Sequence, residues 1–249
     1  MSAINTLLLA AGKSSRIASI SKGLPKPLIQ IGNDPIIFRN LRWLNSFSCV
    51  NAVWINLHYQ AEILRREIKN FSAQLNHLDL HFIFEEEILG TAGALANVSS
   101  QWKPELHSLI IYGDNLFNFD LNDLIETHFS QKHLITVALF DENKNLHTDI
   151  AGGKVVMDDK NRILNFAEGA EHTLSPFVNA GVYVLSPEIT ALIPRDRFYD
   201  FGKDFFPRLL SENIVMHGYL INGYCLGLDT PECFDVANDL INQQKVSLL

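Results

Sequence analysis

The stretch TLLLAAGKSSRIASISKGLPKPLIQ, residues 6–30, decides how the rest of this chain is interpreted. It opens with a short apolar run of strand length at 6–9. Ala10, Ala11 and Gly12 follow, and then the polar turn at 13–16. Small residues directly after a strand let backbone N–H groups approach an anion closely. The pattern is therefore typical of an anion-binding loop, although an ordinary buried strand followed by a solvated turn has the same composition.

The distribution of charge favours the anion. Residues 1–33 contain no Asp or Glu, although the chain carries 28 of them and has a net charge of −8. The same segment contains Lys13, Arg16, Lys22 and Lys26. An acidic chain with one purely basic segment is expected to handle an anion there. The overall negative charge argues against nucleic acid or a membrane surface as a partner, so we expect small-molecule substrates.

The cysteines and the apolar runs indicate where the protein works. Cys49, Cys225 and Cys233 form no CxxC pair, which is typical of a reducing cytoplasm. No apolar run approaches the roughly 18 residues that a transmembrane helix needs, and the first one is too short for a signal peptide. We expect a soluble cytoplasmic protein, and the sequence predicts no oligomeric state.

Helical and strand patterns alternate along the first 140 residues, which predicts an α/β fold: a Rossmann-like, mainly parallel sheet flanked by helices. After residue 140, short strands and turns predict a small antiparallel excursion over 141–185. Thr91 is expected to cap its helix. Helices are expected at 35–47, 59–71, 91–97, 121–129, 205–210 and 231–242, and strands at 52–57, 78–84, 108–112, 134–140 and 215–225.

The motifs AAGKSSR at 10–16 and LPKPL at 24–28 closely resemble the signature of the sugar-1-phosphate nucleotidyltransferases, AAG-x-G-T-R-L…PKPL. The resemblance runs from about Leu7 to Asn238. It implies one domain over 1–249, with a nucleotide-binding part at about 1–140 and a sugar-binding part at about 141–249. It also implies that Arg16 steadies the triphosphate and that Lys26 meets the reacting phosphates. The loop that would wrap the nucleotide consists of Ala10, Ala11, Gly12, Lys13, Ser14 and Ser15, the two serines replacing Gly-Thr.

Asp114 follows Gly113 at the end of the strand predicted at 108–112. A carboxylate at this edge of a sheet can hold Mg²⁺ against triphosphate oxygens, whereas an isolated aspartate there is usually a turn residue. The Gly-Asp pair matches the family's metal-binding motif. The resemblance thus implies that Asp114 binds Mg²⁺.

The segment EEEILGTAGA at 85–94 resembles the family loop that receives the base and ribose, which implies nucleotide contacts by Gly90 and Thr91. Glu85 stands where related thymidylyltransferases have a glutamine that pairs with a pyrimidine. A carboxylate only accepts hydrogen bonds, and guanine offers two adjacent donors, so GTP is favoured. This form also looks like the mannose- and heptose-1-phosphate guanylyltransferases. Alternatively, one or two of the glutamates at 85–87 form a solvated charge run.

The sugar side carries two further resemblances. The motif NAGVY at 179–183 implies that Asn179 contacts the sugar, and FAEG at 166–169 implies the same for Glu168. Gly169 replaces a lysine that usually binds the sugar phosphate. Lys154 and Lys203 are candidates to replace it. Lys203 belongs to YDFGKDFFP at 199–207, which resembles a segment that borders the sugar pocket and is equally consistent with an ordinary helix start.

The segment CLGLDTPE at 225–232 departs from the family pattern Trp/Tyr-x-Asp-Ile-Gly-Thr-Pro. Gly227 stands at the position of the second magnesium ligand, and Asp229 lies two residues later. Asp229 is therefore either the relocated metal ligand or the cap of the helix that starts at Pro231.

Together the motifs predict an enzyme that joins a nucleoside triphosphate and a sugar 1-phosphate, with Mg²⁺ as cofactor, and releases pyrophosphate. Gly169 and Gly227 leave a second hypothesis open, because both remove charges that this chemistry uses. That alternative is a non-catalytic or regulatory protein that binds nucleotide sugars. A third is a transferase that uses a non-sugar phosphate or phosphonate acceptor, or another triphosphate such as UTP or CTP.

Overall fold

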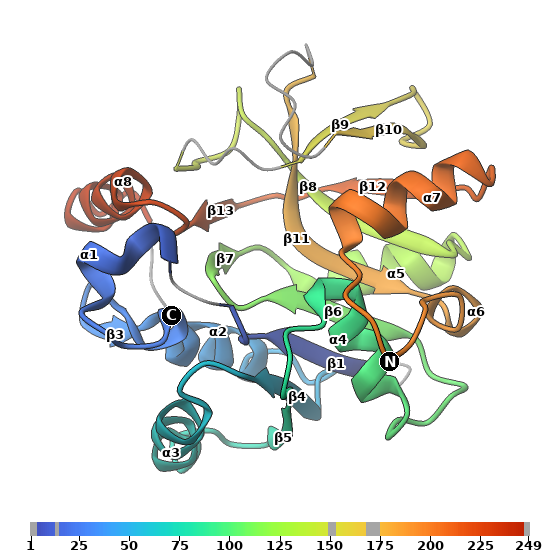
Figure 1. Ribbon diagram of the computed structural model, residues 1–249. Helices are drawn as coiled ribbons and strands as arrows, with labels where there is room; N and C mark the ends of the chain where they lie inside the picture. Colours follow the sequence, from blue (N-terminus) through green and yellow to red (C-terminus); the bar gives the residue numbers. More distant parts are fainter. Residues whose placement is uncertain (1–3, 13–14, 149–152, 168–174, 247–249) are drawn as a thin grey trace.

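The computed structural model describes residues 4–12, 15–148, 153–167 and 175–246. The core of its central sheet is parallel, with neighbouring strands in the order β5-β4-β1-β6. Figure 1 shows these strands side by side in the lower half of the molecule. Their bounds are Asn5–Leu9 for β1, Ala52–Leu57 for β4, Asp79–Phe84 for β5 and Ser108–Tyr112 for β6.

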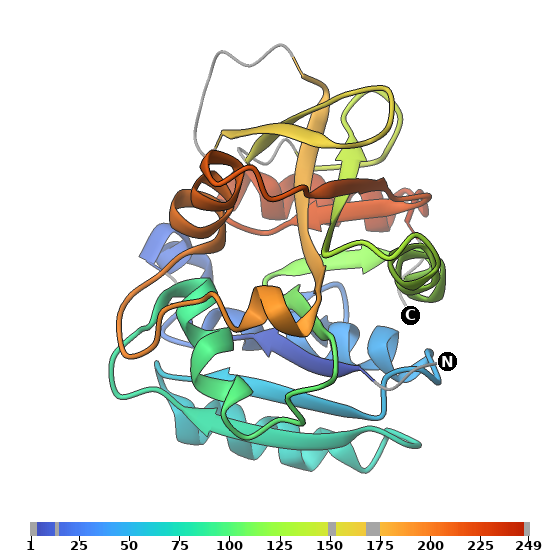
Figure 2. The same cartoon turned by 90° about the vertical axis from the view of Figure 1, so that its right-hand side faces the viewer.

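The second half of the chain continues the sheet in the antiparallel sense. The long strand β11 (Phe177–Leu185) pairs antiparallel with β6, with β8 (Ile135–Asp141) and with β9 (Lys154–Met157). The strand β10 (Ile163–Ala167) forms an antiparallel pair with β9, and the two strands form one edge of this sheet, at the top of Figure 2. The predicted fold class is confirmed, including the antiparallel excursion.

The two faces of the sheet are covered by different helices. Adjacent residues on a strand point to opposite faces, and Leu8 and Leu7 accordingly belong to different apolar clusters. On the side of Leu8 lie α2 (Ile36–Asn45), α3 (Ala61–Ser72) and α5 (Leu121–Ser130). On the side of Leu7 lie α4 (Gly90–Ser99), α6 (Pro187–Thr190) and α7 (Phe206–Ser211).

A third apolar cluster brings the two ends of the described chain together. Ile17 and Ile31 from the N-terminal segment pack with Leu226 and Phe234 from the C-terminal segment. This packing places residue 26 beside residue 229, which becomes important for the site. The elements concerned are the short turns η1 (Ser15–Ile17) and η2 (Lys26–Leu28), α1 (Ala18–Ser21), β2 (Gln30–Ile31), β3 (Asp34–Pro35), β7 (Asn115–Asn118), β13 (Tyr224–Gly227) and α8 (Pro231–Asn242).

The single strand expected at 215–225 is wrong, because the segment forms two strands in different sheets. The strand β12 (His217–Leu220) pairs parallel with β8, whereas β13 pairs antiparallel with β7. Gly223 separates them with φ of 152°, and a Cβ atom there would lie 1.8 Å from Asn118 O. Glycine alone tolerates that approach, so the chain can turn there from one sheet into the other.

The segment before α7 also differs from a plain helix start. Residues Phe201–Phe205 form a π-helical turn, η3, whose N-cap is Asp200. None of the helices in the described part of the chain is long and apolar enough to cross a bilayer.

Candidate active site

A cleft of about 440 Å³ opens where β1, β4, β5 and β6 end at their carboxyl termini. Ligands of open α/β sheets bind at this edge. Many of the residues singled out in the sequence line this cleft: Ala10, Ala11, Gly12, Arg16, Lys26, Glu85, Gly90, Thr91, Asp114, Asn179 and Asp229. Ser15 is the first residue of η1. Lys13, Ser14 and Glu168 lie outside the described residues.

The first loop is fixed by a side chain from the neighbouring strand. Ala10 N donates a 2.7 Å hydrogen bond to Oδ1 of Asn56, which is buried near the end of β4. Gly12 is exposed, and among the described residues no heavy atom beyond its chain neighbours lies within 4 Å of the position that a Cβ would occupy. The backbone of this loop of small residues is therefore open to the cleft at Gly12, as binding of an anion by backbone N–H groups requires.

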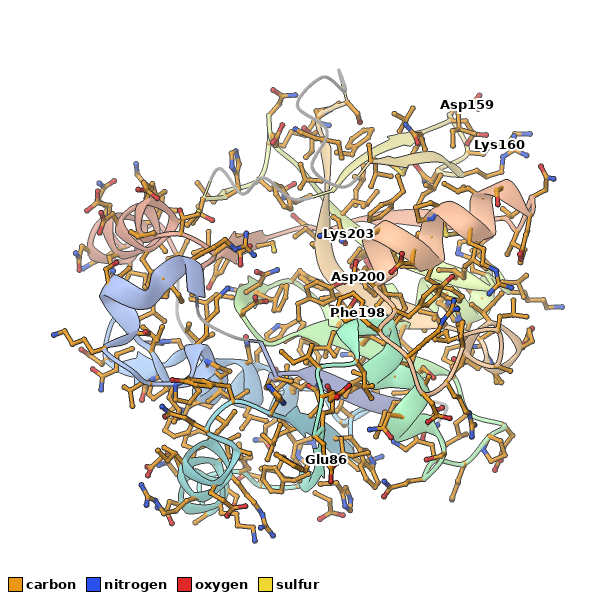
Figure 3. All side chains as sticks on the ribbon, viewed as in Figure 1. Glu86, Asp159, Lys160, Phe198, Asp200 and Lys203 are labelled. Carbon is orange, nitrogen blue, oxygen red and sulfur yellow. The ribbon has the colours of Figure 1, made fainter. Side chains whose placement is uncertain are left out.

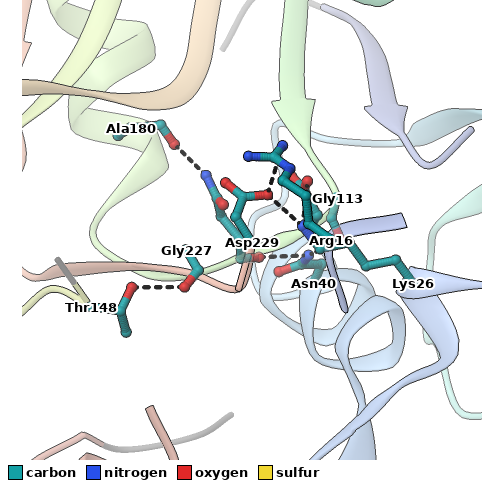
Figure 4. Close-up of polar contacts among 10 residues, drawn as sticks. Arg16, Lys26, Asn40, Gly113, Thr148, Ala180, Gly227 and Asp229 are labelled. Atoms are coloured by element: carbon teal, nitrogen blue, oxygen red, sulfur yellow. Dashed lines mark hydrogen bonds and ion pairs between the residues drawn. The ribbon is translucent and has the colours of Figure 1, made fainter. Parts of the chain in front are cut away.

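Lys26 is the most buried cation of the cleft, with 7% of its surface exposed. Its Nζ donates to Asp114 Oδ2 at 2.8 Å and to Asp229 Oδ1 at 2.7 Å (Figure 4). Burial alone would lower the pKa of Lys26, but the two carboxylates outweigh it and raise the pKa above its usual value. Arg16, which is largely exposed, reaches Asp229 Oδ1 at 3.7 Å. One ammonium from the N-terminal segment thus joins a carboxylate from the middle of the chain to one near its C-terminal end.

The turn that carries Asp114 is held from beneath by α2. Asn40 Nδ2 donates to the carbonyl oxygens of Gly113 and Asn115, at 3.2 and 2.9 Å. Asn115 Nδ2 in turn donates to Ala180 O in β11 at 3.2 Å (Figure 4). A Cβ on Gly113 would lie 2.5 Å from Leu9 O, so the tight turn after β6 requires glycine. These contacts fix the carboxylate of Asp114 at the cleft edge.

The interpretation of Asp229 as a helix cap is wrong. The N-cap of α8 is Thr230, whose Oγ1 accepts a hydrogen bond from Cys233 N at 3.3 Å. Gly227 pairs with Asn115 in the β13–β7 ladder, and its carbonyl accepts a 2.7 Å bond from Thr148 Oγ1. The chain that leaves β13 carries Asp229 into the cleft beside Asp114, so the exchanged aspartate still faces the first one across Lys26.

The paired carboxylates fit Mg²⁺. This cation prefers oxygen ligands, and it usually takes one or two protein carboxylates with waters and substrate phosphates. No three His, Cys, Asp or Glu side chains gather into a metal site in the parts of the chain that the structure describes. Asp114 and Asp229 therefore suit a cation whose remaining ligands come from a phosphate-bearing substrate, rather than a closed structural site.

Glu85 differs from its two glutamate neighbours in that it is buried. It is 2% exposed, while Glu86 and Glu87 are exposed and Glu86 points away from the cleft (Figure 3). The solvated charge run therefore comprises Glu86 and Glu87. Glu85 accepts hydrogen bonds from Asn56 Nδ2 at 2.8 Å and from Leu89 N at 3.2 Å. Burial raises the pKa of Glu85, and these two bonds partly offset that rise.

The start of α4 is capped by the backbone of a distant segment, so the expected cap by Thr91 is wrong. Tyr199 O accepts from Ala92 N at 3.0 Å and from Gly93 N at 2.9 Å. Gly90 has φ of 74°, and a Cβ there would lie 2.6 Å from Tyr199 O, so only glycine allows this approach. A local pattern such as LGTAG cannot reveal an acceptor more than 100 residues away.

Thr91 instead ties α4 to the π-helical turn. Its Oγ1 donates to Asp200 Oδ2 at 2.9 Å and accepts from Phe201 N at 2.9 Å. The far wall of the cleft is formed by Phe198, Asp200 and Lys203, which Figure 3 shows along the segment that leads into α7. Sequence analysis missed Phe198 and Asp200 as lining residues, and only the resemblance of residues 199–207 pointed to this wall.

Asn179, which was expected to contact the sugar, lies at the register shift of β11. Its Nδ2 donates to Tyr183 Oη at 2.7 Å, and its Oδ1 accepts from Gly181 N at 2.9 Å. Asn56 was also missed in the sequence, although a lone polar residue near the end of the apolar strand AVWINL was a usable signal. Of the two lysines considered as replacements at Gly169, Lys203 lines the cleft and Lys154 is bound to Glu142.

Residues 5–228 match the family model described as nucleotidyl transferase, and the chain belongs to that family. It is 28% identical to a UTP–glucose-1-phosphate uridylyltransferase from Synechocystis, over 86% of this chain and 57% of the relative. It is 26% identical to a D-glycero-alpha-D-manno-heptose 1-phosphate guanylyltransferase from Aneurinibacillus thermoaerophilus, over 92% of this chain and 94% of the relative. The expected family resemblance is thereby confirmed.

Among solved structures, the fold is similar to that of HddC from Yersinia pseudotuberculosis complexed with GMP-PN. The TM-score is 0.78 at 22% identity, over 96% of this chain and 99% of that one. Three curated relatives are longer, and the chain spans only 57% to 62% of their lengths. The relatives named above carry both uridylyl- and guanylyltransferase names, so their names do not single out one nucleobase.

Proposed function

We propose that this chain transfers a nucleotidyl group from a nucleoside triphosphate, with GTP favoured, to a sugar 1-phosphate. The observation that carries this function is the cluster of Lys26, Asp114 and Asp229 beside the small-residue loop. A cleft that holds one buried cation and two convergent carboxylates suits a substrate rich in phosphate charge. Membership in the nucleotidyl transferase family supports the same chemistry.

In the proposed reaction, an oxygen of the acceptor's phosphate attacks the α-phosphorus of the triphosphate. A new P–O bond forms, the bond from the α-phosphorus to the bridging oxygen breaks, and pyrophosphate leaves with the electron pair. The phosphate is already an anionic nucleophile, so the chain needs no strong base. It contributes mainly positioning and charge neutralisation.

Each cleft residue has one part in this scheme. Arg16 and Lys26 neutralise charge on the triphosphate, and the loop that ends in Gly12 cradles it through backbone N–H groups. Asp114 and Asp229 would hold Mg²⁺, which when bound supplies charge neutralisation at the phosphates. Lys26 already bridges these two carboxylates, and it has to turn toward the phosphates when they take up the cation. Asn179 and Glu168 are assigned to the sugar.

The preference for GTP is proposed from Glu85. Its carboxylate lies in the cleft wall, where Asn56 and Leu89 N fix its orientation. Each of its oxygens accepts one of these bonds and has a further lone pair available. A guanine base brings two neighbouring donors to such a group, whereas uracil and thymine bring one donor flanked by acceptors.

Pyrophosphate release in a panel of triphosphates and phosphorylated acceptors tests this function. We expect turnover only when a nucleoside triphosphate, a sugar 1-phosphate and Mg²⁺ are all present, and a kcat/KM at least tenfold lower with UTP or CTP than with GTP. Turnover with phosphocholine or a phosphonate, and none with any sugar 1-phosphate, would show that the acceptor is a non-sugar phosphate or phosphonate. Tight nucleotide-sugar binding without turnover would establish the non-catalytic alternative.

A further inference from the structure

We infer that Lys203 is the cation that binds the phosphate of the acceptor substrate. This role rests on the proposed function, because it assigns a ligand to one wall of the same cleft. The acceptor is an anion that must approach a triphosphate, itself an anion. Unless a positive group on its own side of the cleft offsets this repulsion, the two phosphates repel each other.

The charges that line the cleft leave Lys203 available for this task. Among the described residues, three basic side chains line it: Arg16, Lys26 and Lys203. Lys26 is engaged by Asp114 and Asp229, and Arg16 lies near Asp229. Within the described residues, Lys203 has no carboxylate at ion-pair distance. Its ammonium is exposed and carries a charge that no described group of the chain neutralises.

The neighbouring carboxylate of Asp200 is already occupied by other donors. Its Oδ1 accepts from Gly202 N at 3.0 Å and from Lys203 N at 3.1 Å, and its Oδ2 accepts from Thr91 Oγ1. Asp204 Oδ2 in turn accepts from Asp200 N at 2.8 Å. The two aspartates closest in sequence therefore build the turn. They hold the backbone of Lys203 and leave its side chain free to meet a ligand.

The π-helical turn gives this lysine its position. A π turn inserts one residue relative to an α-helical turn, and such turns are frequent at functional sites. Here the turn is anchored to the nucleotide side of the cleft, because Phe201 N and Asp200 both bond to Thr91 at the start of α4. The start of α4, which is proposed to contact the nucleotide, and the turn that carries Lys203 are thus joined by hydrogen bonds.

The location of Lys203 also matches the direction of the reaction. Attacking and leaving oxygens lie roughly in line on opposite sides of the transferred phosphorus. Arg16 and Lys26 belong to the N-terminal segment, on the side of α1 and α8, where the leaving pyrophosphate would be held. Lys203 lies on the other side, before α7, as Figures 1 and 3 show. An acceptor phosphate bound there approaches from the side opposite the pyrophosphate.

The test compares Lys203→Met with a matched variant, Lys154→Met. Lys154 is the other lysine of this half, but it is bound to Glu142 and does not line the cleft. Both variants, the wild type and Lys203→Arg are assayed for the KM of each substrate, with glucose, mannose and heptose 1-phosphates as acceptors. We expect Lys203→Met to raise the acceptor KM about tenfold or more, as expected for loss of a charge-assisted hydrogen bond, and to change the KM for GTP less than twofold. Lys203→Arg should recover most of the loss, and Lys154→Met should match the wild type.

The dependence of the acceptor KM on ionic strength separates a charge role of Lys203 from a purely structural one. The wild-type acceptor KM should rise between 20 and 200 mM salt, and the rise should be much smaller in Lys203→Met, because screening acts on the missing charge. An unchanged acceptor KM in Lys203→Met, or an equal rise in both substrates' KM, would overturn the assignment. A wild type that transfers to no phosphorylated acceptor would instead overturn the proposed function, and this role with it.

Discussion

Lys26 donates a 2.7 Å hydrogen bond to Asp229, although 203 residues separate the two in sequence. The same ammonium donates to Asp114, so it holds two carboxylates together in the cleft. Under the proposed assignment of Asp114 and Asp229 as the residues that would hold Mg²⁺, Lys26 and the cation compete for the same two carboxylates.

This competition predicts the behaviour of Lys26→Met. Without metal, the variant leaves two partly exposed carboxylates facing each other, and we expect a loss of about 1–3 kcal/mol in the free energy of unfolding. Mg²⁺ should bind the variant more tightly than the wild type and raise its Tm further, which thermal unfolding across a magnesium titration would measure. Lys160→Met, on the exposed β9–β10 turn, is the control for lost surface charge. If magnesium raises the Tm of the variant and of the wild type by the same amount, Lys26 does not compete with the metal.

Asp229→Asn should separate metal binding from helix stability. A neutral amide holds Mg²⁺ less well than a carboxylate, so turnover should fall at least tenfold and the half-maximal magnesium concentration should rise. The start of α8 should stay intact, since Thr230 is the cap, and any loss of Tm should come only from the weakened ion pair with Lys26. Thr230→Ala, in contrast, should lower the free energy of unfolding by about 1 kcal/mol and leave the half-maximal magnesium concentration at its wild-type value. If Asp229→Asn titrates like the wild type, Asp229 is no metal ligand.

Glu85→Gln should narrow the preference among nucleobases. The amide presents one acceptor where the carboxylate presented two, so the ratio of kcat/KM for GTP to that for UTP should fall about tenfold. Glu86→Gln, exposed and outside the cleft, should leave this ratio unchanged. A wild-type enzyme that prefers UTP would show that Glu85 does not face the base.

Four histidines far from the cleft predict how stability depends on pH. His128 is fully buried, and its ring nitrogens contact His107 Nδ1 at 2.8 Å and Thr136 Oγ1 at 2.9 Å. His133 contacts the same threonine at 3.1 Å and stacks on His217 with ring centroids 3.7 Å apart. Burial lowers the pKa of His128 to about 3 and that of His133 to about 4.

The direction of these shifts fixes the sign of the effect. The folded chain binds fewer protons than the unfolded chain, whose histidines titrate near 6.5, so stability is fully present above pH 6.5 and falls as the pH drops toward 4 and 3. His128 alone should cost about 2 kcal/mol between pH 7 and pH 5. We expect a steep fall of Tm over this interval and a shallower one in His128→Gln. A Tm that stays constant from pH 7 to pH 5 would contradict the assignment.

The residues that sequence analysis placed correctly in the cleft are those in short motifs at strand ends. Gly12, Asp114 and Glu85 each lie within three residues of the end of a strand, and the carboxyl ends of parallel strands meet at one edge of the sheet. Local spacing thus carried this information.

The expectations that were wrong or undecided concern residues whose partners are far away in the chain. Thr91 was expected to be a cap, but its partner Asp200 lies 109 residues later. The role of Asp229 was undecided because the N- and C-terminal segments meet through an apolar cluster that no motif encodes. The split between β12 and β13 arises where Asn145 Nδ2 donates to the carbonyls of Ile221 and Gly223. Such contacts are set by tertiary packing, which a single sequence does not display.

Asn56 links two properties that evolution would otherwise adjust separately. Its oxygen accepts a hydrogen bond from Ala10 N in the loop proposed to cradle the triphosphate, and its nitrogen donates one to Glu85, which is proposed to face the base. A change at position 85 to a group that needs an acceptor would turn this amide around and leave Ala10 N facing an amino group. Under the proposed assignment, a group at position 85 that donates a hydrogen bond to Asn56 would thus also disturb the loop at Ala10, unless residue 56 is replaced with it.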